Sequence, residues 1–147
     1  MTENFPTLIG KFIHHCGALE FLTNNSIRAF ARDPLLSNDA IKSSWSKRIN
    51  LLQKLLSDRS NISKSDIKNL CDELDEIREK RNLVAHNPIV STKPNESGTE
   101  EILVIRYKTD RANCVNKITK EDVAKLVAHT NKLIKRFAGL VPDSTKT

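Results

Sequence analysis

The clearest helical pattern in the chain closes on the stretch Arg78-Glu79-Lys80-Arg81-Asn82-Leu83-Val84-Ala85-His86-Asn87-Pro88. Upstream of it, apolar residues recur every three or four positions, which is one face of a helix. These residues are Ile67, Leu70, Leu74 and Ile77. Because a proline disfavours helical geometry at the residue before it, we expect this helix to stop by His86 or Asn87.

The same apolar stripe continues to Arg81 and Val84. A guanidinium on an apolar stripe is costly to desolvate unless it finds an acceptor, so Arg81 is expected at the edge of the core or in an interface. Asn82 and His86 are four apart and share a face, whereas Arg81 and His86 are five apart. The latter two side chains converge only if the helix ends near His86 or if a second copy supplies the other half. A plainer interpretation of His86 is a capping group favoured by the helix dipole.

Length and composition bound the class of protein. A chain of 147 residues is expected to form one domain with a core that needs no disulfide or metal. The net charge of +6 is compatible with a polyanionic partner such as nucleic acid, and also with no such partner. Neither a signal peptide nor a run long enough to span a bilayer is expected, so no membrane partner is predicted.

The cysteines are three, and they are widely spaced: Cys16, Cys71 and Cys114. This spacing is typical of neither a disulfide framework nor a zinc site, and it favours a reducing, cytoplasmic location. No metal and no cofactor is predicted.

The first helix is expected from Pro6 or Thr7 toward Asp33, with Thr7 as its N-cap. Glu20 falls on its buried face, where a carboxylate needs a cationic partner. Arg81 is the obvious candidate; the alternative is that Glu20 lies in water at the edge of the face.

Two further helices are expected before the motif. One is capped by Ser37 or Asn38 and carries Trp45, which we expect in the core or in an interface. The other opens at Ser63 or Ser65 and ends in the motif. Its outer face is acidic and is interpreted as solvated: Asp72, Glu73, Asp75, Glu76 and Glu79.

After Pro88 the pattern changes. Residues 91–100 are rich in turn formers and predict a loop, and residues 102–107 and 112–118 predict a β-hairpin. Arg106, Lys108 and Arg111 make the tip of this hairpin basic. Such a tip could line an RNA path, although charge that protects a sheet edge is the more common explanation.

The last helix has a capping-box start at Thr119 with Asp122, and Gly139 is expected to end it. Residues 141–147 are predicted to be a disordered tail. The expected fold is therefore all-α: a single domain over residues 1–140, built as an up-and-down bundle of about four long helices with a small β-hairpin insertion before the last.

Arg81-Asn82, three further residues and His86, at the end of a long helix, resemble the Arg-x(4–6)-His motif of HEPN-domain ribonucleases. The resemblance implies a homodimer whose two motifs face one cleft, and metal-independent cleavage of RNA by its own 2′-hydroxyl. It implies that His86 acts as general base or acid, that Arg81 holds the phosphate and that Asn82 orients the phosphate or His86. Glu20, the candidate partner of Arg81, is a supporting residue. Basic residues near the motif and on the hairpin are candidate RNA contacts: Arg78, Lys80, Arg106, Lys108 and Arg111.

Many HEPN proteins act as toxins or defence effectors beside an antitoxin, so a separate antitoxin or regulatory partner is a further expectation. Pro88 stands where some members carry a tyrosine, which argues against a tyrosine-dependent variant. The alternative is a non-catalytic HEPN-like interaction or RNA-binding module, in which Arg81 pairs with Glu20 as scaffolding.

Overall fold

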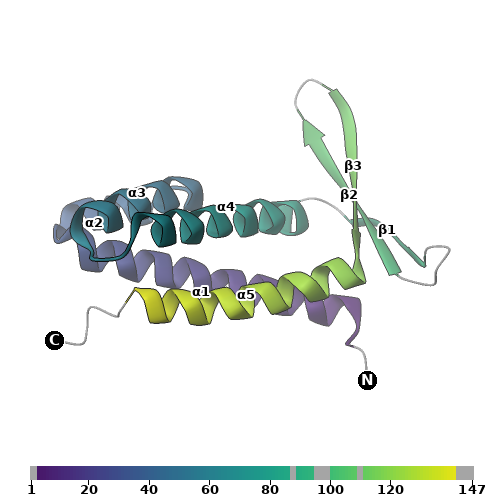
Figure 1. Cartoon of the computed structure of the whole chain (residues 1–147). Coiled ribbons are helices and arrows are strands. Elements are labelled where there is room, and N and C mark those ends of the chain that lie inside the picture. The colour runs from purple at the N-terminus through teal and green to yellow at the C-terminus, as the bar shows by residue number, and fades with distance from the viewer. Residues whose placement is uncertain (1–2, 87–88, 95–99, 109–110, 142–147) are drawn as a thin grey trace.

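The chain folds as a helical bundle from which a small sheet projects (Figure 1). The computed structural model describes residues 3–86, 89–94, 100–108 and 111–141, and side-chain surroundings within 3–85 and 118–141. The helices are α1 (Phe5–Ala31), α2 (Pro34–Ile41), α3 (Trp45–Arg59), α4 (Lys64–His86) and α5 (Lys120–Leu140). The strands are β1 (Ile89–Pro94), β2 (Glu100–Lys108) and β3 (Arg111–Thr119).

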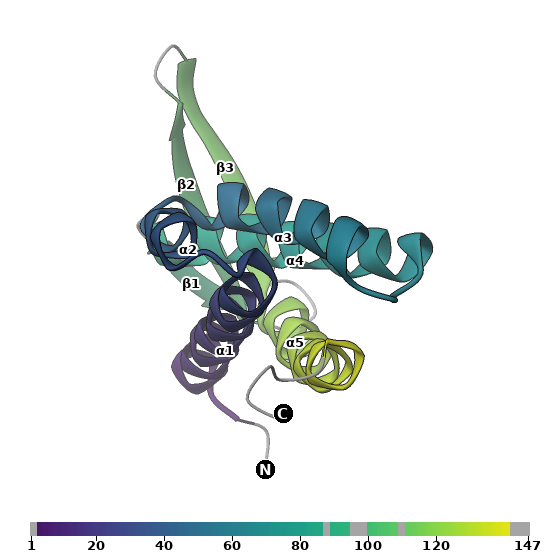
Figure 2. The ribbon, with the colours of Figure 1, turned by 90° about the vertical axis from the view of Figure 1, so that its left-hand side faces the viewer.

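The predicted all-α, up-and-down bundle is confirmed, with a different helix count. Five helices are described in place of about four, because the short α2 stands between α1 and α3. The chain direction therefore alternates from α1 to α5, so that α1 and α5 run the same way side by side (Figures 1 and 2). Helix α4 runs opposite to both, which brings its C-terminal half beside the middle of α1.

The sheet has the order β1-β2-β3, and both pairs are antiparallel. The predicted hairpin is β2–β3, in which Ile102 pairs with Ile118. The additional strand β1 covers residues 91–94, which were predicted as loop. In β1, Ile89 pairs with Val104 of β2, and the register shifts between Ile89 and Ser91. The sheet leaves the bundle at the end where α4 stops and α5 begins (Figure 1).

The boundaries of the first helices differ from prediction because side-chain caps lie elsewhere. Asn4, rather than Thr7, caps α1, and its side chain accepts a hydrogen bond from the Thr7 amide at 2.9 Å. The chain then turns at Arg32, whose φ of 58° is left-handed, and Asp33 caps α2. The single helix predicted to start at Ser37 or Asn38 and to carry Trp45 is interrupted, because Ser44 caps a new helix, α3.

The predicted ends of α4 agree with the structure, and the predicted end of α5 is one residue early. Ser63 accepts from the Asp66 amide at the start of α4, and α4 ends at His86, as predicted from Pro88. Helix α5 continues one residue past Gly139, and Val141, which was assigned to the tail, is buried. The rest of the predicted tail, residues 142–147, lies outside the described residues.

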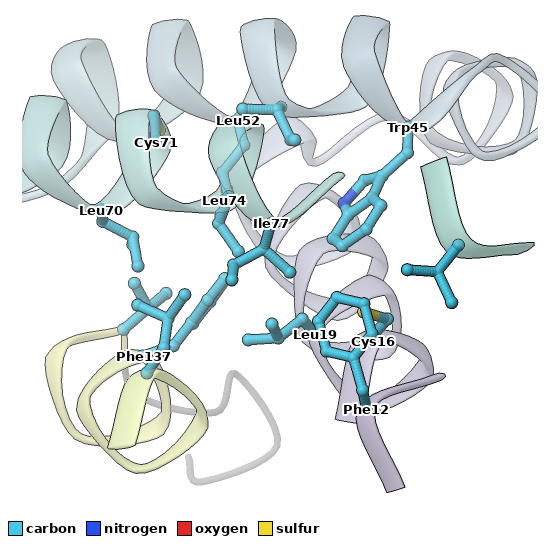
Figure 3. Close-up of a cluster of buried hydrophobic side chains, with 14 of the residues drawn as sticks. Phe12, Cys16, Leu19, Trp45, Leu52, Leu70, Cys71, Leu74, Ile77 and Phe137 are labelled. Atoms are coloured by element: carbon cyan, nitrogen blue, oxygen red, sulfur yellow. The ribbon is translucent and has the colours of Figure 1, made fainter. Parts of the chain in front are cut away.

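The core lies where α1, α3, α4 and α5 meet (Figure 3). The stripe predicted on α4 is buried throughout: Ile67, Leu70, Leu74 and Ile77 are at most 1% exposed. Trp45 is 3% exposed and packs in the same core, as expected. Its indole N–H donates to Thr23 Oγ1 at 3.4 Å, so its polar atom has a partner.

The capping box of α5 gives a first prediction. Asp122 N donates to Thr119 Oγ1 and Thr119 N donates to the Asp122 carboxylate, both at 3.0 Å. Thr119→Ala should therefore cost about 1 kcal/mol of unfolding free energy, or about 2–4 °C in Tm. Thermal denaturation followed by circular dichroism measures this, with Thr119→Ser as the control that keeps the hydroxyl. A Tm equal to that of the native protein would contradict it.

The same box makes stability depend on pH. The hydrogen bond from the Thr119 backbone lowers the pKa of Asp122 below its ordinary value. The contribution is then fully present above the ordinary carboxyl pKa, and it is lost as pH falls through the lowered value. Asp122→Asn should flatten this part of the stability-against-pH curve.

Candidate functional site

Arg81, the first residue of the Arg81–His86 motif, contacts residues of α1 and α3. Its Nη1 donates to Glu20 Oε1 at 2.8 Å, and its guanidinium carbon lies 5.3 Å from the centroid of the Trp45 ring. Cation–π contact and ion pair together hold the guanidinium in one orientation. Of the two interpretations of Glu20, the structure thus shows the paired one. Both side chains are about one-quarter exposed, at 26% for Arg81 and 24% for Glu20.

A second arginine shares Glu20, and the sequence interpretation missed it. Arg48 Nη2 donates to Glu20 Oε2 at 3.0 Å, and Arg48 Nη1 donates to Asn24 Oδ1 at 2.7 Å. The Arg48 side chain is only 10% exposed. We call Glu20, Asn24, Trp45, Arg48 and Arg81 the Glu20 cluster.

A signal for Arg48 exists in the sequence. It lies three residues after Trp45 and four before Leu52, which places it on the buried stripe of α3. Arg81 occupies the equivalent position on the apolar stripe of α4. Two guanidiniums and one carboxylate leave the Glu20 cluster with one net positive charge. Moreover, Nε of Arg48 and Nε of Arg81 are buried without a hydrogen-bond partner.

The other motif residues follow Arg81 on the same regular helix. Asn82 is half-buried, and α4 remains helical as far as His86. Five residues of regular helix separate Arg81 from His86 by about 140° around the axis and about 7.5 Å along it. The backbone of one chain therefore does not bring the two residues onto one face. The His86 side chain lies outside the described side chains.

Of the candidate RNA-contact residues, the structure describes the side-chain surroundings of Arg78 and Lys80, and these differ. Arg78 is ion-paired on its own helix, with Asp75 at 2.9 Å and Glu79 at 3.6 Å. Lys80 is exposed and lines a pocket of about 420 Å³ between α4 and α5, shared with Asp122, Lys125 and His129.

The basic hairpin is described through its backbone only. Lys108 and Arg111 are cross-strand neighbours at its end, and Arg106 pairs with Cys114. Their side chains lie outside the described ones. Their role in an RNA path therefore stays a prediction.

The acidic face of α4 is not uniformly solvated. Glu73 is half-buried against α5, where its carboxylate contacts His129 Nε2 at 3.1 Å and forms an ion pair with Arg136. The solvated interpretation was wrong for Glu73 because α5 supplies two basic side chains to that position. Within the described residues, no three His, Cys, Asp or Glu side chains gather as a metal site would require.

The described cysteines are poor nucleophiles. Burial raises the pKa of the Cys16 thiol to about 12, against a smaller opposite effect of Arg81, and burial raises that of Cys71 to about 11. At neutral pH both are almost entirely protonated. A thiolate mechanism through either residue is therefore disfavoured.

A labelling experiment checks this. In a Cys114→Ser variant, an aromatic disulfide reagent should modify the native protein at least about a hundredfold more slowly than the urea-unfolded protein, because burial raises both thiol pKa values. The release of the coloured thiolate gives the rate. Equal rates in the two states would show that one of the two thiols is accessible and ionised.

Comparison with protein-family models, with curated proteins and with solved structures finds no match to this chain. In the part of the chain that the structure describes, every helix is too short or too polar to cross a membrane.

Proposed function

We propose that this protein is a metal-independent endoribonuclease of the HEPN type. The observation that carries the proposal is the environment of Arg81. Its guanidinium is fixed between Glu20 and Trp45, stays partly exposed, and precedes by five residues the histidine at which α4 ends. An oriented, partly desolvated guanidinium is suited to binding the phosphate of a phosphodiester, and a histidine imidazole, which changes charge near neutral pH, is suited to the proton transfers of its cleavage.

The helix geometry supports a composite site across a homodimer. Because α4 is regular up to His86, the backbone positions of Arg81 and His86 in one chain fall on different sides of the helix. A second copy that presents its own motif would bring an arginine of one protomer to the histidine of the other. The homodimer is therefore part of the proposal.

The chemistry needs only groups of the chain and the RNA. The 2′-hydroxyl loses its proton and its oxygen attacks the adjacent phosphorus, while the bond to the 5′-oxygen breaks and that oxygen takes up a proton. The products are a 2′,3′-cyclic phosphate and a 5′-hydroxyl. His86 serves as general base or acid, Arg81 stabilises the added negative charge on phosphate, and Asn82 orients the phosphate or His86.

The biological setting is a further part of this proposal. A toxin or defence effector in the cytoplasm, controlled by a separate antitoxin or regulatory protein, is the setting that the resemblance implies.

A second candidate function is a non-catalytic HEPN-like interaction or RNA-binding module. The observation that favours it is the ion pair between Glu20 and Arg81, because a paired arginine can serve the fold alone. Under this alternative Arg81 is scaffolding, and the basic net charge serves binding or solubility.

An RNA-cleavage assay with EDTA separates the two candidates. Purified protein is incubated with a mixture of labelled single-stranded and structured RNAs, and product ends are identified by phosphatase resistance before and after acid treatment. The proposal expects cleavage that leaves cyclic phosphate ends and is absent from an identically purified Arg81→Ala/His86→Ala variant. Wild-type protein that binds RNA without cutting it would favour the module instead.

A further inference from the structure

We infer that Arg48 is a positioning residue of a phosphodiester-binding site: by holding one oxygen of Glu20 it leaves the Glu20 cluster one net positive charge, and so keeps Arg81 able to bind a phosphate of RNA. This inference rests on the proposed function for its substrate. It adds a residue that neither the motif nor the resemblance contains.

The first step is the division of the hydrogen bonds. Both terminal nitrogens of Arg48 are used, one on Glu20 and the other on Asn24. Among the described side chains Arg81 donates one hydrogen bond, from Nη1 to Glu20, and its Nε is buried, so the N–H groups that an incoming anion can reach are those of its terminal nitrogens. A guanidinium has five N–H donors, so Arg81 retains donors for a further acceptor.

The second step is exposure. The Arg48 side chain is 10% exposed and that of Arg81 is 26% exposed, so an incoming anion reaches Arg81 and not Arg48. Trp45, itself 3% exposed, lies against the guanidinium and limits its rotation. Arg48 therefore acts through Glu20, as a positioning residue rather than a catalytic one.

The third step is charge. Without Arg48, the ion pair of Glu20 and Arg81 would carry no net charge. The Glu20 carboxylate would then compete with phosphate for the N–H donors of Arg81. Because Arg48 occupies the second carboxylate oxygen at 3.0 Å, the negative charge of Glu20 is shared between two cations. In a partly desolvated site the uncompensated charge is favourable only when an anion binds.

Three variants vary the charge of the cluster independently of Arg81. Arg48→Met gives the Glu20 cluster no net charge, and Glu20→Gln gives it a net charge of +2. The double variant restores the net charge of +1. A fourth variant, Lys47→Met, removes a charge from an exposed neighbouring position of α3 and is the matched control. All are made in a His86→Ala background, so that RNA is bound and not cut.

The measurement is the Kd of a fluorescein-labelled single-stranded RNA, obtained from anisotropy at constant low salt. Arg48→Met should weaken binding about tenfold or more, since one charge-assisted contact with phosphate is worth at least that factor. The double variant should return to within about threefold of the parent, and Glu20→Gln should bind at least as tightly. Lys47→Met should change binding by less than about threefold.

A merely structural role predicts another order. Both single substitutions disturb the ion pairs, so affinity would then follow Tm, and the double variant would bind worst; that result would overturn the inference. If Arg48→Met does not fold, Arg48→Gln, which keeps a donor to Glu20 without the charge, takes its place with the same expected loss.

The outcomes also separate this inference from the proposed function. Binding in the order of cluster charge without cleavage by the wild-type protein would refute the ribonuclease and support the role of Arg48. Cleavage by the wild-type protein with binding indifferent to cluster charge would support the ribonuclease and refute the role of Arg48.

Discussion

Alanine at both Arg81 and His86 should lower the rate of RNA cleavage by at least about a thousandfold. Removing one donor to a developing oxyanion typically costs about a hundredfold to a thousandfold, and loss of a general acid or base costs a similar factor. The two losses are not additive, because both residues act on the same transition state. Initial rates on 5′-labelled RNA in the presence of EDTA give the factor.

The interpretation requires that the double variant stays folded. Removing Arg81 leaves Glu20 paired with Arg48, so the carboxylate is not stranded in the core. Circular dichroism should therefore show the helical spectrum of the native protein. The single variant His86→Ala, which leaves the Glu20 cluster intact, should by itself lose about a hundredfold or more in rate.

A matched control removes a charge elsewhere on α4. Lys68 is exposed and pairs with Asp72 on its own helix, so Lys68→Ala should cut RNA at the wild-type rate within about twofold. Undiminished cleavage by the double variant would refute the assignment of Arg81 and His86 as catalytic residues.

Glu20→Ala should produce the largest loss of stability among single substitutions of the polar residues in the Glu20 cluster. It removes the carboxylate that two guanidiniums share and leaves the largely buried Arg48 with Asn24 alone. Breaking a buried ion pair costs about 3–5 kcal/mol, and the partial exposure of Glu20 favours the lower value, about 3 kcal/mol. For a chain of this length that corresponds to a Tm lower by about 6–12 °C.

Urea denaturation followed by circular dichroism measures the free-energy change, and thermal denaturation measures the Tm. Glu76→Ala serves as the control, because Glu76 is exposed on α4 and its loss should shift Tm by no more than about 2 °C. A Tm for Glu20→Ala that matches the control would contradict the structural importance of the cluster. It would weigh most heavily against the module in which Arg81 is scaffolding.

The periodicity of the sequence was sufficient for much of the bundle. The apolar stripe of α4 follows from spacings of three and four, and the end of α4 at His86 follows from Pro88. These features are local, because each depends on residues within a turn or two of helix. The break between α2 and α3 is local too, but both sides carry apolar residues in helical register, and this concealed the cap at Ser44.

The same local arguments reached only half of the candidate site. Position on an apolar stripe predicted that Arg81 needs a partner and suggested Glu20. Arg48 has the equivalent position on the buried stripe of α3, but it was not predicted. No pattern in the sequence marks Asn24 as its partner. For Glu73, a run of acidic neighbours suggested solvent, whereas α5 supplies His129 and Arg136.

By itself the sequence determined that the chain is mostly helical, which face of α4 is buried and where α4 ends, at the Arg81 and His86 motif. Only the tertiary structure decided that Arg48 and Arg81 meet on one carboxylate, and that β1 joins the hairpin. The physical reason is distance along the chain. The two ion pairs join residues 28 and 61 positions apart, and helix periodicity indicates that a face is buried but not which helix covers it.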